Sequence, residues 1–184
     1  VMFDGANLPF EDNVRETSQI ARIAKAVNVD IEAELGKVGN TSFGTGKADE
    51  IPDVFTDVEE SARLIAATKV DALAIAIGNL HGRYVATPKL NIQRLKEISH
   101  RNNLPLVLHG GSGTSEEDFK SCIHNGISKI NVATALQMAV TAAVQDYLKT
   151  AKNPNYIDMK GVMVEATKEA VKRHMILFES VGRA

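Results

Sequence analysis

The sequence alternates between short apolar runs and longer amphipathic stretches. The apolar runs start near residues 1, 29, 72, 104 and 129, and a pattern with apolar residues at helical spacing follows each of them. A repeat of about 30 residues is typical of the βαβ unit, in which consecutive strands are parallel. The sequence therefore predicts an α/β fold with five parallel strands and a helix after each strand.

Polar residues mark where these helices should begin. An N-cap side chain accepts a hydrogen bond from the first turn of its helix, and Ser, Thr, Asp and Asn do this best. The stretch at residues 153–155 should separate the helix after the fifth strand from a last amphipathic helix that holds Val162, Ala166, Ala170, Val171 and Phe178. The predicted caps are Thr56 or Asp57, Asn91, Ser115 and Thr134.

Polar side chains also stand where the predicted strands end. In (β/α)8 barrels the active site lies at the carboxyl ends of the strands, whereas a doubly wound sheet gathers its ligand at one switch point. Functional residue types on every strand favour a TIM (β/α)8 barrel. Such a barrel typically has about 250 residues, so we expect residues 1–184 to supply about the last five βα units of a single domain. The strand-end residues are Asp4, Glu34, His81, His109 and Asn131.

Composition limits the classes of function. The 184 residues are 44% hydrophobic, carry a formal net charge of −2 and include no Trp. Dispersed Lys and Arg residues on a near-neutral chain give no basic surface, so no nucleic-acid partner is predicted. No apolar run reaches the roughly 20 residues that cross a bilayer, and no membrane partner is predicted. The single cysteine, Cys122, excludes an internal disulfide and favours the cytoplasm.

The most informative loop follows the apolar run at residues 104–108. It begins with His109 and continues through Gly110, Gly111 and Ser112, before Ser115 opens the next helical pattern. Backbone N–H groups near a helix N-terminus suit a phosphate, although the glycines could serve only the geometry of a tight turn.

Two histidines at the ends of consecutive strands suggest a metal site. His81 and His109 each follow an apolar strand and precede a glycine. A single histidine at a strand end is more often structural, but a matched pair favours a metal. Catalytic zinc usually has three protein ligands, so Glu34 or a residue outside this sequence should supply the third. The long loop at residues 36–52 is typical of an active-site segment, with residues 39–50 its most mobile part.

Together these stretches resemble the carboxyl-terminal two-thirds of a class II, zinc-dependent ketose-bisphosphate aldolase. The resemblance covers almost the whole chain and is specific only when its motifs are taken together. Those motifs are VMFDG (1–5), LPFE (8–11), EAELG (32–36), AIAIG (74–78), HG (81–82), LVLHGGSG (106–113) and KINVAT (129–134).

The resemblance implies roles for individual residues. His81 and His109 would bind Zn²⁺, and the acids Asp4 and Glu34 would lie close to the metal or to a second, monovalent cation such as Na⁺ or K⁺. The family's acid/base aspartate and third zinc histidine belong to the strand before the one that opens this sequence, so no catalytic residue is expected within the chain. The residues expected to hold dihydroxyacetone phosphate are Gly82, Gly110, Gly111, Ser112, Asn131, Val132, Ala133 and Thr134.

The implied reaction is a zinc-dependent aldol cleavage of fructose or tagatose bisphosphate in carbohydrate metabolism such as glycolysis, by a homo-oligomer (dimer or tetramer). A Schiff-base aldolase would instead need a lysine at the carboxyl end of a strand, and Lys129 is predicted to begin its strand. A non-catalytic phosphosugar-binding barrel fragment is the alternative, and metal content with retro-aldol activity separates the two.

Overall fold

The computed structural model describes residues 1–41, 55–82 and 89–183, without the side chains of 39–41 and 80–82. The described chain forms two compact units, Val1–Asn131 and Val132–Ala184, and each is described by itself.

The first unit is built on a five-stranded parallel sheet. Its strands lie in the order β1-β2-β4-β6-β7, which is also their order in the chain. A doubly wound sheet reverses direction at a switch point, whereas a barrel adds each strand beside the previous one. The order therefore agrees with part of an α/β barrel. The strands are β1 (Met2–Phe3), β2 (Glu32–Leu35), β4 (Ala72–Ile75), β6 (Leu106–Leu108) and β7 (Ile127–Ile130).

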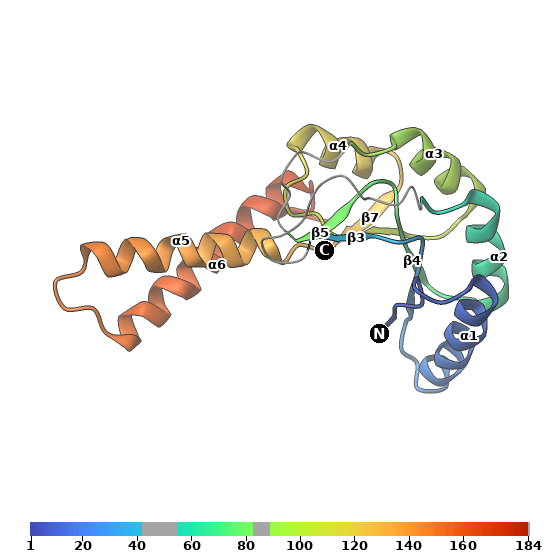
Figure 1. The fold of residues 1–184 in the computed structure, drawn as a ribbon, viewed down its shortest axis with the longest axis horizontal. Helices are drawn as coiled ribbons and strands as arrows, with labels where there is room; N and C mark the ends of the chain where they lie inside the picture. Colours follow the sequence, from blue (N-terminus) through green and yellow to red (C-terminus); the bar gives the residue numbers. More distant parts are fainter. Residues whose placement is uncertain (42–54, 83–88, 184) are drawn as a thin grey trace. The chain divides into compact units, whose positions relative to one another are not determined.

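A helix follows each of the first four strands of this sheet. Figure 1 shows these four helices following one another in an arc around the sheet. Between the helices and the strands lies a core whose largest side chains, such as Leu64, Leu73 and Leu106, are 0% exposed. The helices are α1 (Phe10–Ala26), α2 (Val58–Thr68), α3 (Ile92–Arg101) and α4 (Glu116–His124).

Three of the predicted helix caps are confirmed. The Asp57 carboxylate accepts from two backbone N–H groups of α2, Asn91 accepts from Arg94, and Ser115 accepts from Asp118. The prediction for Thr134 is wrong, because Thr134 is already the first helical residue and Ala133 at the cap position accepts no hydrogen bond through a side chain.

The buried face of α1 also differs from the prediction. Val14, Ile20, Ala21, Ala24 and Val27 recur at helical spacing in the sequence, which predicts that they form the buried face. The structure buries Ala21 and Ala24 but places Asn13 and Thr17 beside them. Val27 is 67% exposed. The reason is a tertiary hydrogen bond: Asn13 Nδ2 donates to the backbone oxygen of Glu34 at 2.9 Å, which turns this polar side of the helix toward the sheet.

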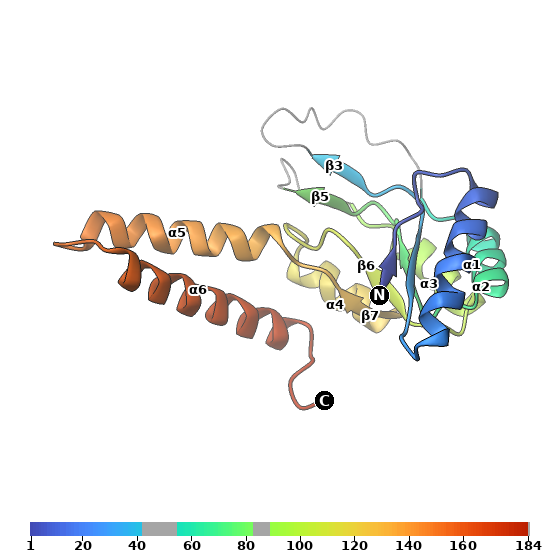
Figure 2. The ribbon, with the colours of Figure 1, turned by 90° about the horizontal axis from the view of Figure 1, so that it is seen from below.

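Two short strands were not predicted from the sequence. Strands β3 (Gly39–Thr41) and β5 (Leu80–Gly82) form a separate two-stranded parallel sheet in which His81 pairs with Asn40 (Figure 2). His81 therefore lies on its own strand, and the prediction of a loop throughout residues 36–52 is wrong at 39–41. Residues 42–50, on which most of the mobility prediction falls, lie outside the described residues.

The position of β7 corrects a second prediction. The sequence placed a strand at 129–133, but β7 runs from Ile127 to Ile130, so Lys129 is its penultimate residue. The shift arises because Ile127 is buried in the core at 4% exposure and pairs with Leu106. Lys129 thus lies near the carboxyl end of its strand, opposite to the expectation.

The second unit is a helical hairpin. Helices α5 (Thr134–Thr150) and α6 (Tyr156–Leu177) run side by side, joined by the turn predicted at 153–155 (Figure 2). Among the described residues of α5 none is buried, and in α6 only Ala170 is buried. The other apolar positions that the sequence suggested for the last helix, such as Val171 at 39% exposure, lie at or near the surface.

Candidate active site

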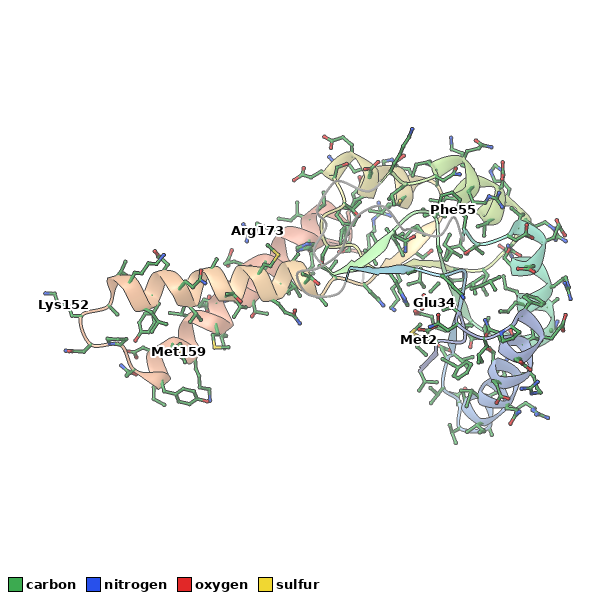
Figure 3. The ribbon with its side chains drawn as sticks, viewed as in Figure 1. Met2, Glu34, Phe55, Lys152, Met159 and Arg173 are labelled. Carbon is green, nitrogen blue, oxygen red and sulfur yellow. The ribbon has the colours of Figure 1, made fainter. Side chains whose placement is uncertain are left out.

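One face of the sheet carries a buried polar cluster near the carboxyl ends of its strands. Glu32 and Glu34 come from β2, and His109 directly follows β6. His109 Nε2 lies 2.9 Å from Glu32 Oε1, and His109 Nδ1 lies 3.0 Å from Glu34 Oε2. All three residues are less than 10% exposed. Figure 3 shows Glu34 on the side of its strand that faces away from α1 and α2.

The strand register explains how residues two strands apart can meet. Strand β4 lies between β2 and β6, and its Ala72 and Ala74 are the register partners of Glu32 and Glu34. Neighbouring strands are about 4.8 Å apart, so a contact across β4 must pass over these two side chains. Because alanine is small, the glutamates and His109 can reach each other above it.

The charges in this cluster support one another. Burial lowers the pKa of His109, but hydrogen bonds and attraction from Glu34 and then Glu32 outweigh burial and raise it overall. Burial raises the pKa of Glu32, and hydrogen bonds from Lys129 and His109 outweigh that effect, so its pKa lies below the usual value. The arrangement therefore favours a negative Glu32 between two cationic partners.

Lys129 connects this cluster to Asn131. Its Nζ donates to Glu32 Oε2 at 2.8 Å and to Asn131 Oδ1 at 2.9 Å. Sequence reasoning missed both Lys129 and Glu32 as site residues. The signal for Glu32 was present, because the alternation of β2 puts it on the same face as Glu34; the signal for Lys129 was hidden by the error in the strand boundary.

Buried amide and hydroxyl side chains fix the strand ends around the cluster. Asn79 Nδ2 donates to the backbone oxygen of His109 at 3.0 Å, while its Oδ1 accepts from Ile77 N at 2.8 Å. Thr56 Oγ1 donates to Leu35 O and accepts from Ala76 N at 2.8 Å. These bonds hold the backbone beside Glu34 and His109, so the acidic and imidazole groups lie on a rigid support.

The glycine loop after His109 approaches β7 closely. Gly111 N donates to Asn131 O at 3.2 Å, and a Cβ on Gly111 would come within 3.0 Å of Ile130. Gly110 has φ +66°, a conformation that glycine adopts without strain. Glycine at these two positions therefore allows the loop to lie against the end of β7, and Ser112 beside them is 7% exposed.

The N-terminus of α4 is already occupied by its own residues. Ser115 caps it, and Glu116, Glu117 and Asp118 put three acids in its first turn. An anion that approaches this helix end would therefore meet three acidic side chains, and phosphate binding at the loop stays a prediction.

The other predicted residues lie elsewhere or beyond the description. Asp4 is exposed and accepts from Ala6 N at 3.0 Å in a turn. His81 and Gly82 are described only as the backbone of β5. Val132, Ala133 and Thr134 belong to the second unit. Among the side chains that the structure describes, which do not include those of 39–41 and 80–82, no three from His, Cys, Asp or Glu are grouped so as to hold a metal ion.

A sequence model of one protein family matches residues 1–183 and describes class-II fructose-bisphosphate aldolases. This chain belongs to that family. The match confirms the resemblance seen in the sequence motifs.

Named relatives agree with this membership. The chain is 40% identical to a fructose-bisphosphate aldolase of Geobacillus stearothermophilus over all of this chain and 63% of that protein. It is also 40% identical to a fructose-bisphosphate aldolase of Mycoplasma pneumoniae, over 83% of this chain and 52% of the relative. The chain thus spans less than two thirds of the length of these relatives.

Solved structures show the same fold. The YdjI aldolase from Escherichia coli K12 superposes with a TM-score of 0.85 at 33% identity, covering 100% of this chain and 62% of that one. A fructose-bisphosphate aldolase from Campylobacter jejuni gives a TM-score of 0.72 at 25% identity, covering 97% of this chain and 59% of the other.

None of the helices in the described ranges combines the length and apolar character needed to span a bilayer.

Proposed function

We propose that this chain forms part of a class II aldolase that reversibly cleaves a ketose 1,6-bisphosphate, of fructose or tagatose configuration, into dihydroxyacetone phosphate and glyceraldehyde 3-phosphate. The observation that carries the proposal is His109 held between Glu32 and Glu34 beside the glycine loop. Family membership supplies the reaction class, and the cluster supplies residues suited to it.

The donor set fits Zn²⁺. A neutral imidazole has one N–H and one lone pair, so only one of the two carboxylates can accept a hydrogen bond from His109. The other carboxylate and the ring nitrogen that carries the lone pair then face a shared position that suits a cation. We assign Glu32 the hydrogen bond at Nε2, since Lys129 already holds that carboxylate, and we assign Glu34, His109 and His81 to the zinc.

When bound, zinc acts as a Lewis acid toward the negative charge that develops on substrate oxygens. The residues of the chain position the substrate. N–H groups of Gly110, Gly111 and Ser112 are suited to a phosphate, and Thr114 Oγ1 is a buried hydroxyl without a hydrogen-bond partner among the described residues. Binding the remote phosphate fixes the reacting carbon.

Further residues complete the proposed site from the family pattern. Gly82, Asn131, Val132, Ala133 and Thr134 would hold the dihydroxyacetone phosphate portion, and Asp4 would bind a second, monovalent cation such as Na⁺ or K⁺. The acid/base aspartate is expected from a part of the protein that this sequence does not include.

Three wider proposals accompany the reaction. Residues 1–184 would form the carboxyl-terminal portion of one barrel domain, the protein would be a homo-oligomer, and it would act in the cytoplasm in carbohydrate metabolism such as glycolysis. The compartment rests on the single cysteine of the sequence, Cys122, whose thiol is buried; burial, with a smaller effect of Asp118, raises its pKa to about 12. Light scattering of the full-length protein would test the oligomeric state.

The test of function compares His109→Ala with the parent in the full-length protein. We expect the mutant to lose bound zinc and the cleavage of ketose bisphosphate, because one metal ligand is gone, and to stay folded with a lower thermal midpoint, because Glu32 and Glu34 lose a buried partner. His100→Ala is the matched control, since His100 is exposed at the end of α3. Activity of the parent that resists a chelator, or an active and zinc-replete His109→Ala protein, contradicts the mechanism. A His109→Ala protein that no longer folds would instead show that His109 is required for the fold.

A further inference from the structure

We infer that Lys129 is a positioning residue that couples the metal-binding side of the site, through Glu32 and His109, to the substrate-binding side at Asn131. The inference rests on the proposed function and assigns Lys129 a part in it that touches neither metal nor substrate.

A continuous chain of polar contacts carries the argument. Lys129 Nζ contacts Glu32 Oε2 at 2.8 Å, and the other oxygen of the same carboxylate contacts His109 Nε2 at 2.9 Å. On its other side Lys129 Nζ contacts Asn131 Oδ1 at 2.9 Å. One ammonium therefore sets the orientation of a carboxylate and of an amide, and through the carboxylate it sets the orientation of an imidazole.

The topology makes this link unusual. Strands β2 and β7 are not neighbours, because β4 and β6 lie between them in the sheet. The register places Val107 opposite both Ala74 on β4 and Lys129 on β7, so Lys129 shares the face of the sheet that carries the glutamates. Only a long cationic side chain on this face of a curved sheet can bridge such a separation to a carboxylate.

The contact with Glu32 has an electrostatic consequence. Glu32 is 8% exposed, and a buried carboxylate is costly unless it is paired. With the ammonium on Oε2, the other oxygen of the Glu32 carboxylate is held toward His109 Nε2 and can accept its hydrogen. That bond directs the lone pair of the ring to Nδ1, on the side of Glu34. Without the ammonium, Glu32 keeps His109 as a partner but loses the contact that holds its second oxygen and fixes its rotamer.

The contact with Lys129 determines whether Asn131 presents a hydrogen-bond donor or an acceptor to a substrate. Because Asn131 Oδ1 accepts from Lys129, its Nδ2 amino group is directed away from the lysine. Asn131 then presents a donor, which suits the hydroxyl and phosphate oxygens of a phosphorylated sugar. Removal of the ammonium would release the amide to rotate and present an acceptor.

The exposure of the Lys129 side chain distinguishes a positioning role from a role in the packing of the core. The Lys129 side chain is 53% exposed, so its replacement opens no cavity in the core. A variant should therefore fold, and changes in its metal affinity and kinetics can be attributed to positioning.

The experiment uses the full-length protein in zinc-loaded and metal-free forms, with the variants Lys129→Met, Lys129→Arg and the control Lys120→Met on the exposed side of α4. Zinc affinity is measured by competition with a chelator, and kcat and KM with ketose bisphosphate. We expect Lys129→Met to weaken zinc binding about 10- to 100-fold and to raise KM as well as lower kcat. Lys129→Arg should keep most of the zinc affinity, because the guanidinium preserves the charge, and Lys120→Met should match the parent.

Two further readouts distinguish positioning from general damage. In metal-free protein at alkaline pH, where the imidazole is neutral, nitrogen NMR of His109 should show the Nε2–H tautomer in the parent and a mixture in Lys129→Met. Adding Lys129→Met to Glu32→Gln should cost little more zinc affinity than Glu32→Gln alone, since the lysine acts through that carboxylate. Parental zinc affinity and kinetics in Lys129→Met would overturn this inference while leaving the proposed function intact. A parent without zinc-dependent cleavage would overturn both.

Discussion

Helices α1 to α4 of the first unit and helices α5 and α6 of the second differ in what their apolar residues contact. Every buried apolar residue that the structure describes belongs to the first unit, with the exception of Ala170. In α6, by contrast, Ile157 is 73% exposed and Ile176 is 69% exposed. The apolar residues of α1 to α4 gather on one face of each helix, whereas those of α5 and α6 are less concentrated on one face. The difference shows that the helices with a single apolar face are the ones that build a core.

The polar residues of the two units differ in the same way. In the first unit, Glu32, Glu34 and His109 are buried and hold one another. In the second unit the ion pairs Lys168–Glu165 and Lys172–Glu169 lie on the surface of one helix. Surface pairs of this kind contribute little to stability and are screened by salt. The first unit therefore has the fixed charges that chemistry requires.

The strongest test of the comparison is a pair of leucine truncations in helices. Leu95 in α3 is 0% exposed and Leu148 in α5 is 52% exposed. We expect Leu95→Ala to lower the free energy of unfolding by about 3 kcal/mol, because it leaves a cavity. Leu148→Ala should change it by less than about 0.5 kcal/mol. Urea unfolding followed by circular dichroism measures both. A cost for Leu148→Ala close to that of Leu95→Ala would show that the hairpin residue is covered in solution.

Two matched helix caps provide a finer test. Ser115 accepts from Asp118 N at the start of α4, and Asn155 accepts from Asp158 N at the start of α6. Loss of either cap should cost about 1 kcal/mol. We expect Ser115→Ala to weaken the amide-exchange protection of β6 and β7, and Asn155→Ala to weaken only that of α6. Equal effects of Asn155→Ala on the strands of the first unit would mean that the two units unfold together.

The dependence of stability on pH should come from the first unit. In chelator-treated protein, the raised pKa of His109 gives stability that is complete below its usual value of 6.5 and is lost as pH rises through the raised pKa. The lowered pKa of Glu32 gives stability that is present above 4.5 and is lost as pH falls through the lowered pKa. Stability should therefore be greatest between these two pH values.

Variants can show which residue causes each part of the dependence of stability on pH. The decline above pH 6.5 should be absent from His109→Asn, because no imidazole remains to lose its proton. Glu169→Gln on the surface of α6 should leave the shape of the profile unchanged. A profile that keeps its decline in His109→Asn would mean that another group controls it.

The smallest effect concerns thiol labelling under native conditions, which leaves stability unchanged. Cys122 is 0% exposed and its pKa is raised to about 12, so iodoacetamide should modify it very slowly. A cysteine introduced as Val164→Cys, at a position 62% exposed on α6, should react at the rate of a free thiol. Mass spectrometry of digested protein measures both sites in one sample. Equal labelling rates would contradict the difference in burial.

The sequence predicted much of the first unit because its signals are local. Short apolar runs mark the strands, and Asp57, Asn91 and Ser115 mark helix starts through hydrogen bonds to residues close by in the chain. The order of strands in the sheet also follows from the repeat, since a singly wound α/β unit adds strands in chain order. For the same reason, the sequence alone places His109 and Glu34 at the same edge of the sheet.

Tertiary structure decided the features that depend on residues far apart in the chain. Asn13 is buried because it bonds the backbone of Glu34, so helical spacing of apolar residues could not find it. Strands β3 and β5 pair with each other, and neither coincides with an apolar run that would predict a strand.

The features of the candidate site also divide into those that the sequence predicted and those that only the fold decided. Residue types and motifs in the sequence predicted that Glu34, His109 and a glycine loop would lie at the carboxyl ends of parallel strands. Only the fold decided that both nitrogens of His109 face carboxylates, and that Lys129 reaches Glu32 across two intervening strands. The reason is that side-chain contacts across a sheet depend on strand register and curvature, and small residues such as Ala74 control them without any motif of their own.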